Sequence, residues 1–161
     1  MDNLQCIAPK NIKLLFENGQ LDIMKVLSLL QVLRNKSKKK FYTVEDIIFY
    51  YSLVNFDLIK ILDEDISNLM KNRNRYLRFN KSINQIILEL SNLEYIDIKG
   101  NISYKKDRIG VRLNEEGERF LKTFDSEYFL QLMELHQNII TNISNNSINK
   151  NRVKGLLKWI K

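Results

Sequence analysis

Two stretches of this sequence indicate its architecture: LELSNLEYI at residues 88–96 and VRLNEEGERFL at residues 111–121. In the first stretch, the helical spacing of apolar residues gives way to the alternation that is typical of a β-strand. Gly100 and Asn101 then predict a turn, and the second stretch returns as another strand that ends before Asn114. Because Asn114 is a favourable N-cap residue, a further helix is expected directly after it.

Outward from these stretches, the apolar spacing predicts mostly helix. Thr43 is a favourable N-cap, and Asp46 lies at the position that completes a capping box. Ser82, with Gln85 three residues later, carries the same signature and predicts another helix start. Residues 142–149 are polar and predict a linker or tight turn. The expected helices cover residues 21–33, 44–54, 57–71, 82–93, 115–121 and 126–143.

We therefore expect a mostly α-helical protein with a small β-hairpin. The chain has 161 residues, which is near the usual size of one domain with a single core. Residues 1–20 are predicted to form an N-terminal arm, residues 21–124 the main domain, and residues 125–161 a C-terminal helical extension. That extension ends in a short apolar stripe among basic residues, and so small a segment needs something to pack against.

The composition speaks against several classes of function. Hydrophobic residues at 44% and charged residues at 28% are ordinary for a globular protein. One cysteine and one histidine exclude an internal disulfide and argue against a zinc site or a Cys–His catalytic pair. The five glycines form no phosphate-binding loop. We expect no catalysis, no cofactor, no metal and no small-molecule substrate.

Localisation is predicted from the absence of two sequence signals. No apolar run reaches the ~18–20 residues that are needed to span a bilayer. The first ten residues lack the basic and apolar regions of a signal peptide. We expect a cytoplasmic protein that makes no contact with a membrane.

The order of predicted elements resembles the winged helix-turn-helix fold: helix, helix, capped helix, two-stranded wing, helix. The similarity is densest in residues 88–96 and 111–121, where a helix runs into a Tyr-Ile strand and a hairpin returns into a "leucine-threonine-x-x-glycine" pattern. Asn114 replaces the threonine of that pattern and can cap the helix in the same way. The resemblance covers residues 21–124 and implies C-terminal helices added to a winged helix.

A narrower resemblance lies in LDI at residues 21–23, KVL at 25–27, Phe41, and VEDIIFYYSLVNF at 44–56. These motifs are similar to the small middle subunits of bacterial three-component ABC-ATPase systems, including Lamassu-type antiphage defence. The family implies a subunit that joins an SMC-like ATPase to an effector, often a nuclease, without catalysis of its own.

The charge pattern gives candidate DNA-binding residues but does not select DNA as the ligand. The net charge of +7 is compatible with nucleic acid or with an acidic protein. Asn84 and Gln85 can read base edges from the predicted recognition helix, although that helix is poor in arginine. Lys105, Lys106 and Arg108 at the wing can contact phosphates. An acidic ATPase surface would serve these wing residues equally well.

Surplus aromatic and apolar residues give a candidate protein interface. Core packing is the default interpretation of apolar residues at helical spacing, and a partner surface is the alternative. The candidate interface residues are Phe49, Tyr50, Phe56, Met133, Leu156, Leu157 and Trp159.

Two hypotheses follow from the sequence. In the first, the chain is a non-enzymatic winged-helix accessory subunit that holds an SMC-like ABC ATPase and its effector nuclease together in antiphage defence. This hypothesis leaves open a non-specific contact with double-stranded DNA. In the second, the chain is a homodimeric winged-helix transcription regulator, and the helix at residues 126–143 forms the dimer interface.

Overall fold

The computed structural model describes residues 20–56, 69–101, 105–106, 108–124 and 126–155. The expected arm at 1–20, the expected helix at 57–71 and the apolar residues Leu156, Leu157 and Trp159 therefore lie wholly or almost wholly outside the described residues. No helix in the described part is long and apolar enough to cross a membrane.

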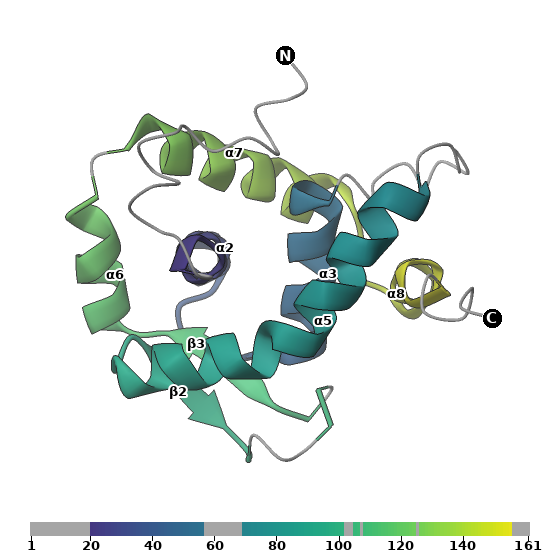
Figure 1. Cartoon of the computed structure of the whole chain (residues 1–161). Coiled ribbons are helices and arrows are strands. Elements are labelled where there is room, and N and C mark those ends of the chain that lie inside the picture. The colour runs from purple at the N-terminus through teal and green to yellow at the C-terminus, as the bar shows by residue number, and fades with distance from the viewer. Residues whose placement is uncertain (1–19, 57–68, 102–104, 107, 125, 156–161) are drawn as a thin grey trace.

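The described residues form a mostly helical fold with a small antiparallel sheet, which confirms the expected mostly α-helical class (Figure 1). The sheet has three strands in the order β1-β3-β2. The elements are α2 (Gln20–Lys36), β1 (Tyr42–Thr43), α3 (Val44–Asn55), α5 (Leu69–Asn92), β2 (Ile96–Lys99), β3 (Gly110–Leu113), α6 (Glu115–Lys122), α7 (Glu127–Asn142) and α8 (Ser147–Lys154).

The sheet contains the predicted hairpin and one strand that sequence reasoning did not predict. In the hairpin, β2 and β3 are antiparallel, with Ile96 opposite Leu113. The additional strand, β1, pairs with β3 through Tyr42 and Thr43. A two-residue strand has no periodicity to detect, so only its tertiary pairing reveals it.

Helix α2 forms the centre of the fold. Figure 1 shows it end-on, with α7, α6, α3, α5 and the sheet around it, and α2 contacts all four helices as well as β3. Every residue from Met24 to Arg34 is buried. A helix that is apolar on nearly all sides is stable only inside a core, and this explains the central position. Helix α7 packs against both α2 and α3, so the predicted C-terminal extension shares the core of the main domain.

A buried arginine connects α2 to the hairpin and α6. Arg34 donates to the Leu113 carbonyl oxygen at 2.9 Å and forms an ion pair with Glu118 at 3.0 Å. Gln31 donates to the same carboxylate at 3.1 Å. These hydrogen bonds, first that from Gln31 and then that from Arg34, hold the pKa of Glu118 below its ordinary value. The charge of Arg34 is therefore paired where it is buried, as burial requires.

Asn114 and Gly117 form the junction between the hairpin and α6. The Asn114 side chain accepts a hydrogen bond from the Gly117 backbone N–H at 2.9 Å, which confirms the predicted N-cap. The same side chain donates to the Glu94 carbonyl oxygen at 2.8 Å, and the Asn114 N–H donates to Tyr95 O at 3.1 Å. A Cβ at Gly117 would lie 2.4 Å from Tyr95 O, so only glycine fits without a shift of the backbone.

Helix α5 is longer than the sequence predicts, and the expected helix start at Ser82 is wrong. Ser82 lies in the middle of α5 and donates its hydroxyl to the Phe79 carbonyl oxygen at 3.2 Å. Tyr76, Phe79 and Ile83 are all buried on one side of the helix. Packing of this continuous face keeps the helix intact across a local capping signal.

Three of the expected interface aromatics are instead part of the core. Phe49, Tyr50 and Phe56 are 2%, 5% and 6% exposed. Phe56 packs edge-on against Tyr51 and Phe79, which stack on each other with ring centroids 3.9 Å apart. Core packing, the default interpretation, therefore holds for these three residues. Phe56 packs at the junction of α3 and α5, and none of the three side chains forms an exposed surface.

His136, the one histidine of the sequence, is also buried. It is 0% exposed on α7, and neither ring nitrogen has a hydrogen-bond partner among the described residues. Burial, together with the charge of Lys25, lowers the pKa of His136 to about 3. The imidazole is therefore neutral in the folded protein at physiological pH.

The Gly117 contact can be tested by adding a single methyl group. Gly117→Ala should lower the free energy of unfolding by about 2–3 kcal/mol, because the new Cβ must displace the Tyr95 backbone. Gly155→Ala is the matched control, since a Cβ there meets nothing within 4 Å and the backbone is already helical. Urea denaturation measures both. Equal stabilities of the two variants would contradict the proposed close approach.

The burial of His136 predicts acid sensitivity. The imidazole has a lower pKa when folded than when unfolded, so the unfolded chain takes up the proton and stability falls as the pH drops below about 6.5. The loss should be about 1.4 kcal/mol per pH unit, or roughly 2 kcal/mol between pH 6.5 and 5. His136→Leu should lack this loss. Urea denaturation at both pH values tests it, and parallel profiles would refute a buried neutral histidine.

Candidate functional site

The wing is the segment between β2 and β3, and it is attached to two helices. Lys105 and Arg108 are exposed, as phosphate contact requires. Lys106 is not: its ammonium donates to both the backbone and side-chain oxygens of Asn80 on α5, and burial lowers its pKa. Lys106 therefore fastens the wing to α5, which corrects its predicted place among the exposed DNA-binding residues.

The wing also satisfies the first backbone donors of α3. The N–H of Val44 donates to the Ile109 carbonyl oxygen at 2.9 Å, and that of Glu45 donates to Lys106 O at 3.1 Å. The next donor, the N–H of Asp46, reaches the Thr43 hydroxyl at 3.0 Å and completes the predicted capping box. Backbone donors in the first turn of a helix have no intrahelical partner, so these contacts fix the wing against α3.

Helix α5 exposes a single stripe of side chains. Gln85 lies on this stripe, as predicted. Asn84 is half-buried beside it, and its side-chain oxygen is buried without a hydrogen-bond partner among the described residues. Arg78 and Lys81 share the stripe, because α5 begins well before Ser82 and carries both residues on the same helix as Gln85. The exposed residues with described side chains on α5 are Asn74, Arg78, Lys81, Gln85, Leu88 and Asn92.

Arg112, on β3 next to the wing, is a further cation that the chain uses internally. It forms an ion pair with Asp97 across the hairpin at 3.0 Å and lies 4.2 Å from the ring centroid of Phe41. It also donates to the Lys39 carbonyl oxygen at 3.0 Å. These contacts orient Arg112 along the sheet, so Lys105 and Arg108 are the wing cations that face solvent in the described part of the segment.

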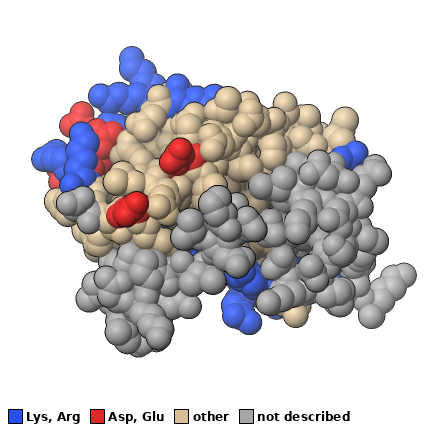
Figure 2. Space-filling model, turned by 90° about the horizontal axis from the view of Figure 1, so that it is seen from above, with Lys and Arg blue, Asp and Glu red and all other residues tan. Residues whose placement is uncertain are grey.

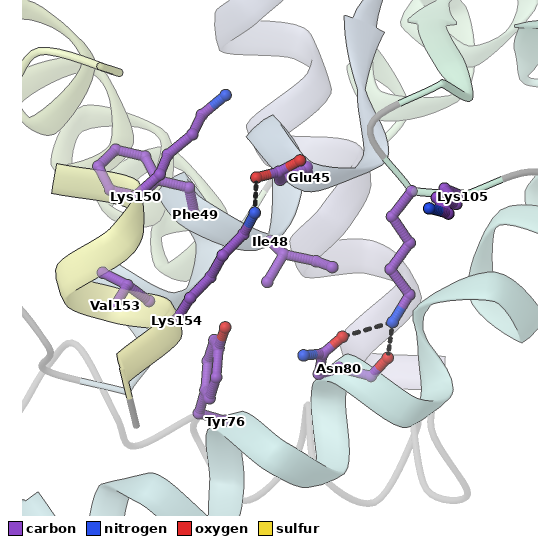
Figure 3. A pocket seen from close by; sticks show the side chains of 10 residues that line it. Glu45, Ile48, Phe49, Tyr76, Asn80, Lys105, Lys150, Val153 and Lys154 are labelled. Carbon is purple, nitrogen blue, oxygen red and sulfur yellow. Dashed lines mark hydrogen bonds and ion pairs between the residues drawn. The ribbon is translucent and has the colours of Figure 1, made fainter. Parts of the chain in front are cut away.

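A pocket of about 390 Å³ lies where α3, α5, α8 and the base of the wing meet (Figure 3). Its floor is apolar, whereas its rim carries four lysines and one glutamate. Tyr76 lies at one wall with its hydroxyl directed into the pocket. The lining residues are Glu45, Ile48, Phe49, Tyr76, Asn80, Lys105, Lys106, Lys150, Val153 and Lys154.

Helix α8 forms one wall of the pocket and is held by the acidic first turn of α3. Lys154 pairs with Glu45, and Lys150 pairs with Asp46 at 2.5 Å. Asn145, just before α8, donates to the same Asp46 carboxylate at 2.8 Å. Burial would raise the pKa of Asp46, but the hydrogen bonds from Lys150 and Asn145 hold it below its ordinary value. These ion pairs and hydrogen bonds therefore hold α8 against the N-terminus of α3.

Helix α8 begins inside the segment that was expected to be a linker. Asn146 is its N-cap and accepts a hydrogen bond from the Asn149 N–H at 2.8 Å. Val153 is the buried residue of this helix. Met133, the remaining described member of the predicted interface, is partly buried against the core on α7. The structure therefore brings none of the described interface candidates together as an exposed surface.

The face formed by α7 is nearly free of basic side chains. Figure 2 shows this side of the molecule, with uncharged side chains over most of the described surface and Lys and Arg gathered mainly at its ends. Helix α7 contains no lysine or arginine along its 16 residues. Phosphate contacts are therefore not expected on this helix.

Comparisons with known proteins leave the site to be interpreted from its own chemistry. No protein-family model, curated protein or solved structure matches the chain. Among the described residues, no group of three His, Cys, Asp or Glu side chains is placed to hold a metal ion. What the pocket offers chemically is an apolar floor, a hydroxyl donor and a cationic rim.

The docking of α8 can be tested at Asp46. Asp46→Ala should lower the free energy of unfolding by about 2 kcal/mol, because it removes hydrogen bonds to a charged, mostly buried carboxylate. The folded pKa lies below the unfolded value of 3.8, so this contribution is present at neutral pH and is lost as the pH falls through the folded pKa. Asp97→Ala is the control: its ion pair with Arg112 is more accessible to solvent than that of Asp46 with Lys150 and should contribute less than about 1 kcal/mol. Urea denaturation at pH 7 compares them, and a larger effect at Asp97 would contradict this prediction.

Proposed function

We propose that this chain is a non-enzymatic winged-helix accessory subunit that bridges an SMC-like ATPase and an effector nuclease in bacterial antiphage defence. The order α2, α3, α5, the β2–β3 hairpin and α6 supports the winged helix-turn-helix assignment. The resemblance of residues 21–56 to the middle subunits of three-component ABC-ATPase systems supports the biological role. The described parts of those motifs form α2 and α3, at the centre of the fold.

The pocket beside the wing is the observation that carries the adaptor function. Protein interfaces place apolar anchors in pockets that a polar rim surrounds. The apolar floor here fits that arrangement, whereas a phosphate backbone is contacted by cations and hydrogen-bond donors and gains nothing from an apolar floor. In addition, Lys106 on the wing and Arg112 on β3 are engaged within the chain. Both features favour a protein partner as the main ligand.

The exposed stripe of α5 favours a second candidate, the homodimeric DNA-binding regulator. Arg78 and Lys81 bring positive charge to the same stripe as Gln85, which can read adenine. This helix is therefore better suited to DNA than the shorter, nearly neutral helix that the sequence predicts. Lys105 and Arg108 on the wing add two further cations that can contact phosphate.

Co-purification and DNA binding distinguish the two functions. We expect the tagged chain, expressed with its neighbouring genes, to retain a large SMC-like ATPase and an effector through size-exclusion chromatography. The isolated chain should not protect a palindromic DNA site. A stable homodimer that protects one such site, without any retained ATPase, would overturn the adaptor function.

The same assay tests whether α5 contacts DNA. The double variant Arg78→Ala and Lys81→Ala should reduce the slope of log affinity against log salt by about 2 if both side chains contact phosphates. Arg119→Ala with Lys122→Ala is the control, because it removes equal charge from exposed positions on α6. A purely protein-binding adaptor predicts weak binding with the same salt slope in both variants.

A further inference from the structure

We propose that the pocket between α3, α5, α8 and the wing base binds an acidic segment of a partner protein through one apolar anchor side chain. The inference rests on the adaptor function and deepens it, because it names the site and the chemistry of the partner.

The floor of the pocket suits an apolar side chain. Ile48 and Phe49 come from one turn of α3, and Val153 faces them from α8. The volume of about 390 Å³ lies within the range of binding pockets, near its lower end. Filling this space with an aromatic or aliphatic side chain removes apolar surface from water on both molecules. The floor thus favours a partner residue with an apolar side chain as the anchor.

The charges at the rim favour acidic residues next to that anchor in the partner segment. Four lysines line the pocket, but Lys150 pairs with Asp46 and Lys154 pairs with Glu45, which leaves the two positive charges of Lys105 and Lys106 in surplus. Lys105 and Lys106 belong to the wing, and Lys154 from α8 is paired with Glu45 on α3 (Figure 3). A carboxylate next to an apolar anchor would therefore meet Lys105 or Lys106 on the wing side, and this charge complementarity favours an acidic segment.

Tyr76 adds a hydrogen-bond donor inside the pocket. Its hydroxyl points into the space between α5 and α8. Burial and the charge of Glu45 raise the pKa of Tyr76 to about 12, so the phenol is protonated and can donate to a carboxylate at neutral pH. Glu45 repels an additional anion at its own end of the rim. The segment is therefore expected to place its carboxylates near Lys105 and Tyr76.

A protein segment fits these features better than a nucleic acid does. Phosphates are recognised by exposed cations and backbone donors, and they place nothing on an apolar floor. Arg108, the exposed wing cation closest in sequence, does not line the pocket. Nucleic acid would contact both Lys105 and Arg108. An occupant of the pocket would contact Lys105 but not Arg108. This difference provides the test.

The experiment titrates the full-length ¹⁵N-labelled chain with a blocked peptide, Glu-Glu-Phe-Glu-Glu, and follows amide shifts by NMR. We expect saturable shifts at Phe49, Tyr76, Lys105 and Val153, with a dissociation constant below about 1 mM. A peptide with alanine in place of phenylalanine should bind at least about 10-fold more weakly, because it lacks the anchor. A peptide with lysines in place of the glutamates should not bind.

Two charge reversals provide the matched pair of variants. Lys105→Glu should weaken binding of the acidic peptide about 5-fold, whereas Arg108→Glu, with the same change in charge, should weaken it less than about 2-fold. Both side chains are exposed, and the spectra of the free variants show whether each remains folded. Equal losses in the two variants, shifts confined to the exposed stripe of α5, or no saturable binding would overturn the proposal.

The test separates this proposal from the adaptor function itself. If the peptide fails to bind but the ATPase and effector still co-purify, the pocket assignment is wrong and the adaptor function stands. If the peptide binds but no ATPase or effector co-purifies, the site is real and the adaptor function fails. Shifts that depend on chain concentration without peptide would identify a second copy of this chain as the occupant and overturn the proposal.

Discussion

The close approach of Gly117 to the Tyr95 carbonyl is the constraint on which the arrangement of hairpin and helices depends. It allows the first turn of α6 to pack directly on the start of β2, with Asn114 capping the helix and holding the Glu94 carbonyl oxygen. This junction places Glu118 where Arg34 of α2 can reach it. The central helix, the hairpin and α6 are thus positioned by one backbone contact that requires glycine.

The N-terminus of α3 organises the other half of the molecule. Its backbone donors are satisfied by the wing, and two of its acidic side chains, Glu45 and Asp46, hold α8. The pocket therefore exists because three segments that are distant in sequence meet at one helix end. The positive end of the α3 dipole also favours the two carboxylates in its first turn. Any partner that enters the pocket contacts the wing and α8 at the same time.

Local signals in the sequence predicted the elements well, and tertiary effects explain the errors. Thr43 and Asn114 cap their helices as predicted, because capping involves residues only three positions apart. Ser82 carries a similar signal and does not start a helix, because the packing of α5 against the core outweighs it. Of the candidate site, Lys105, Arg108 and Gln85 are exposed as predicted. Lys106 is not, because its partner Asn80 lies 26 residues away.

Periodicity, capping and composition determine, without any coordinates, that the chain is mostly helical with one hairpin and where most of its helices begin. These properties depend on neighbours within a few residues, so they can be read from the order of amino acids. Tertiary structure alone shows that Phe49, Tyr50, Phe56 and His136 are buried, and that Lys105 and Lys106 meet α8 across an apolar floor. Burial and pocket formation depend on which distant surfaces pack together, because a side chain at helical spacing looks the same whether a core or a partner covers it.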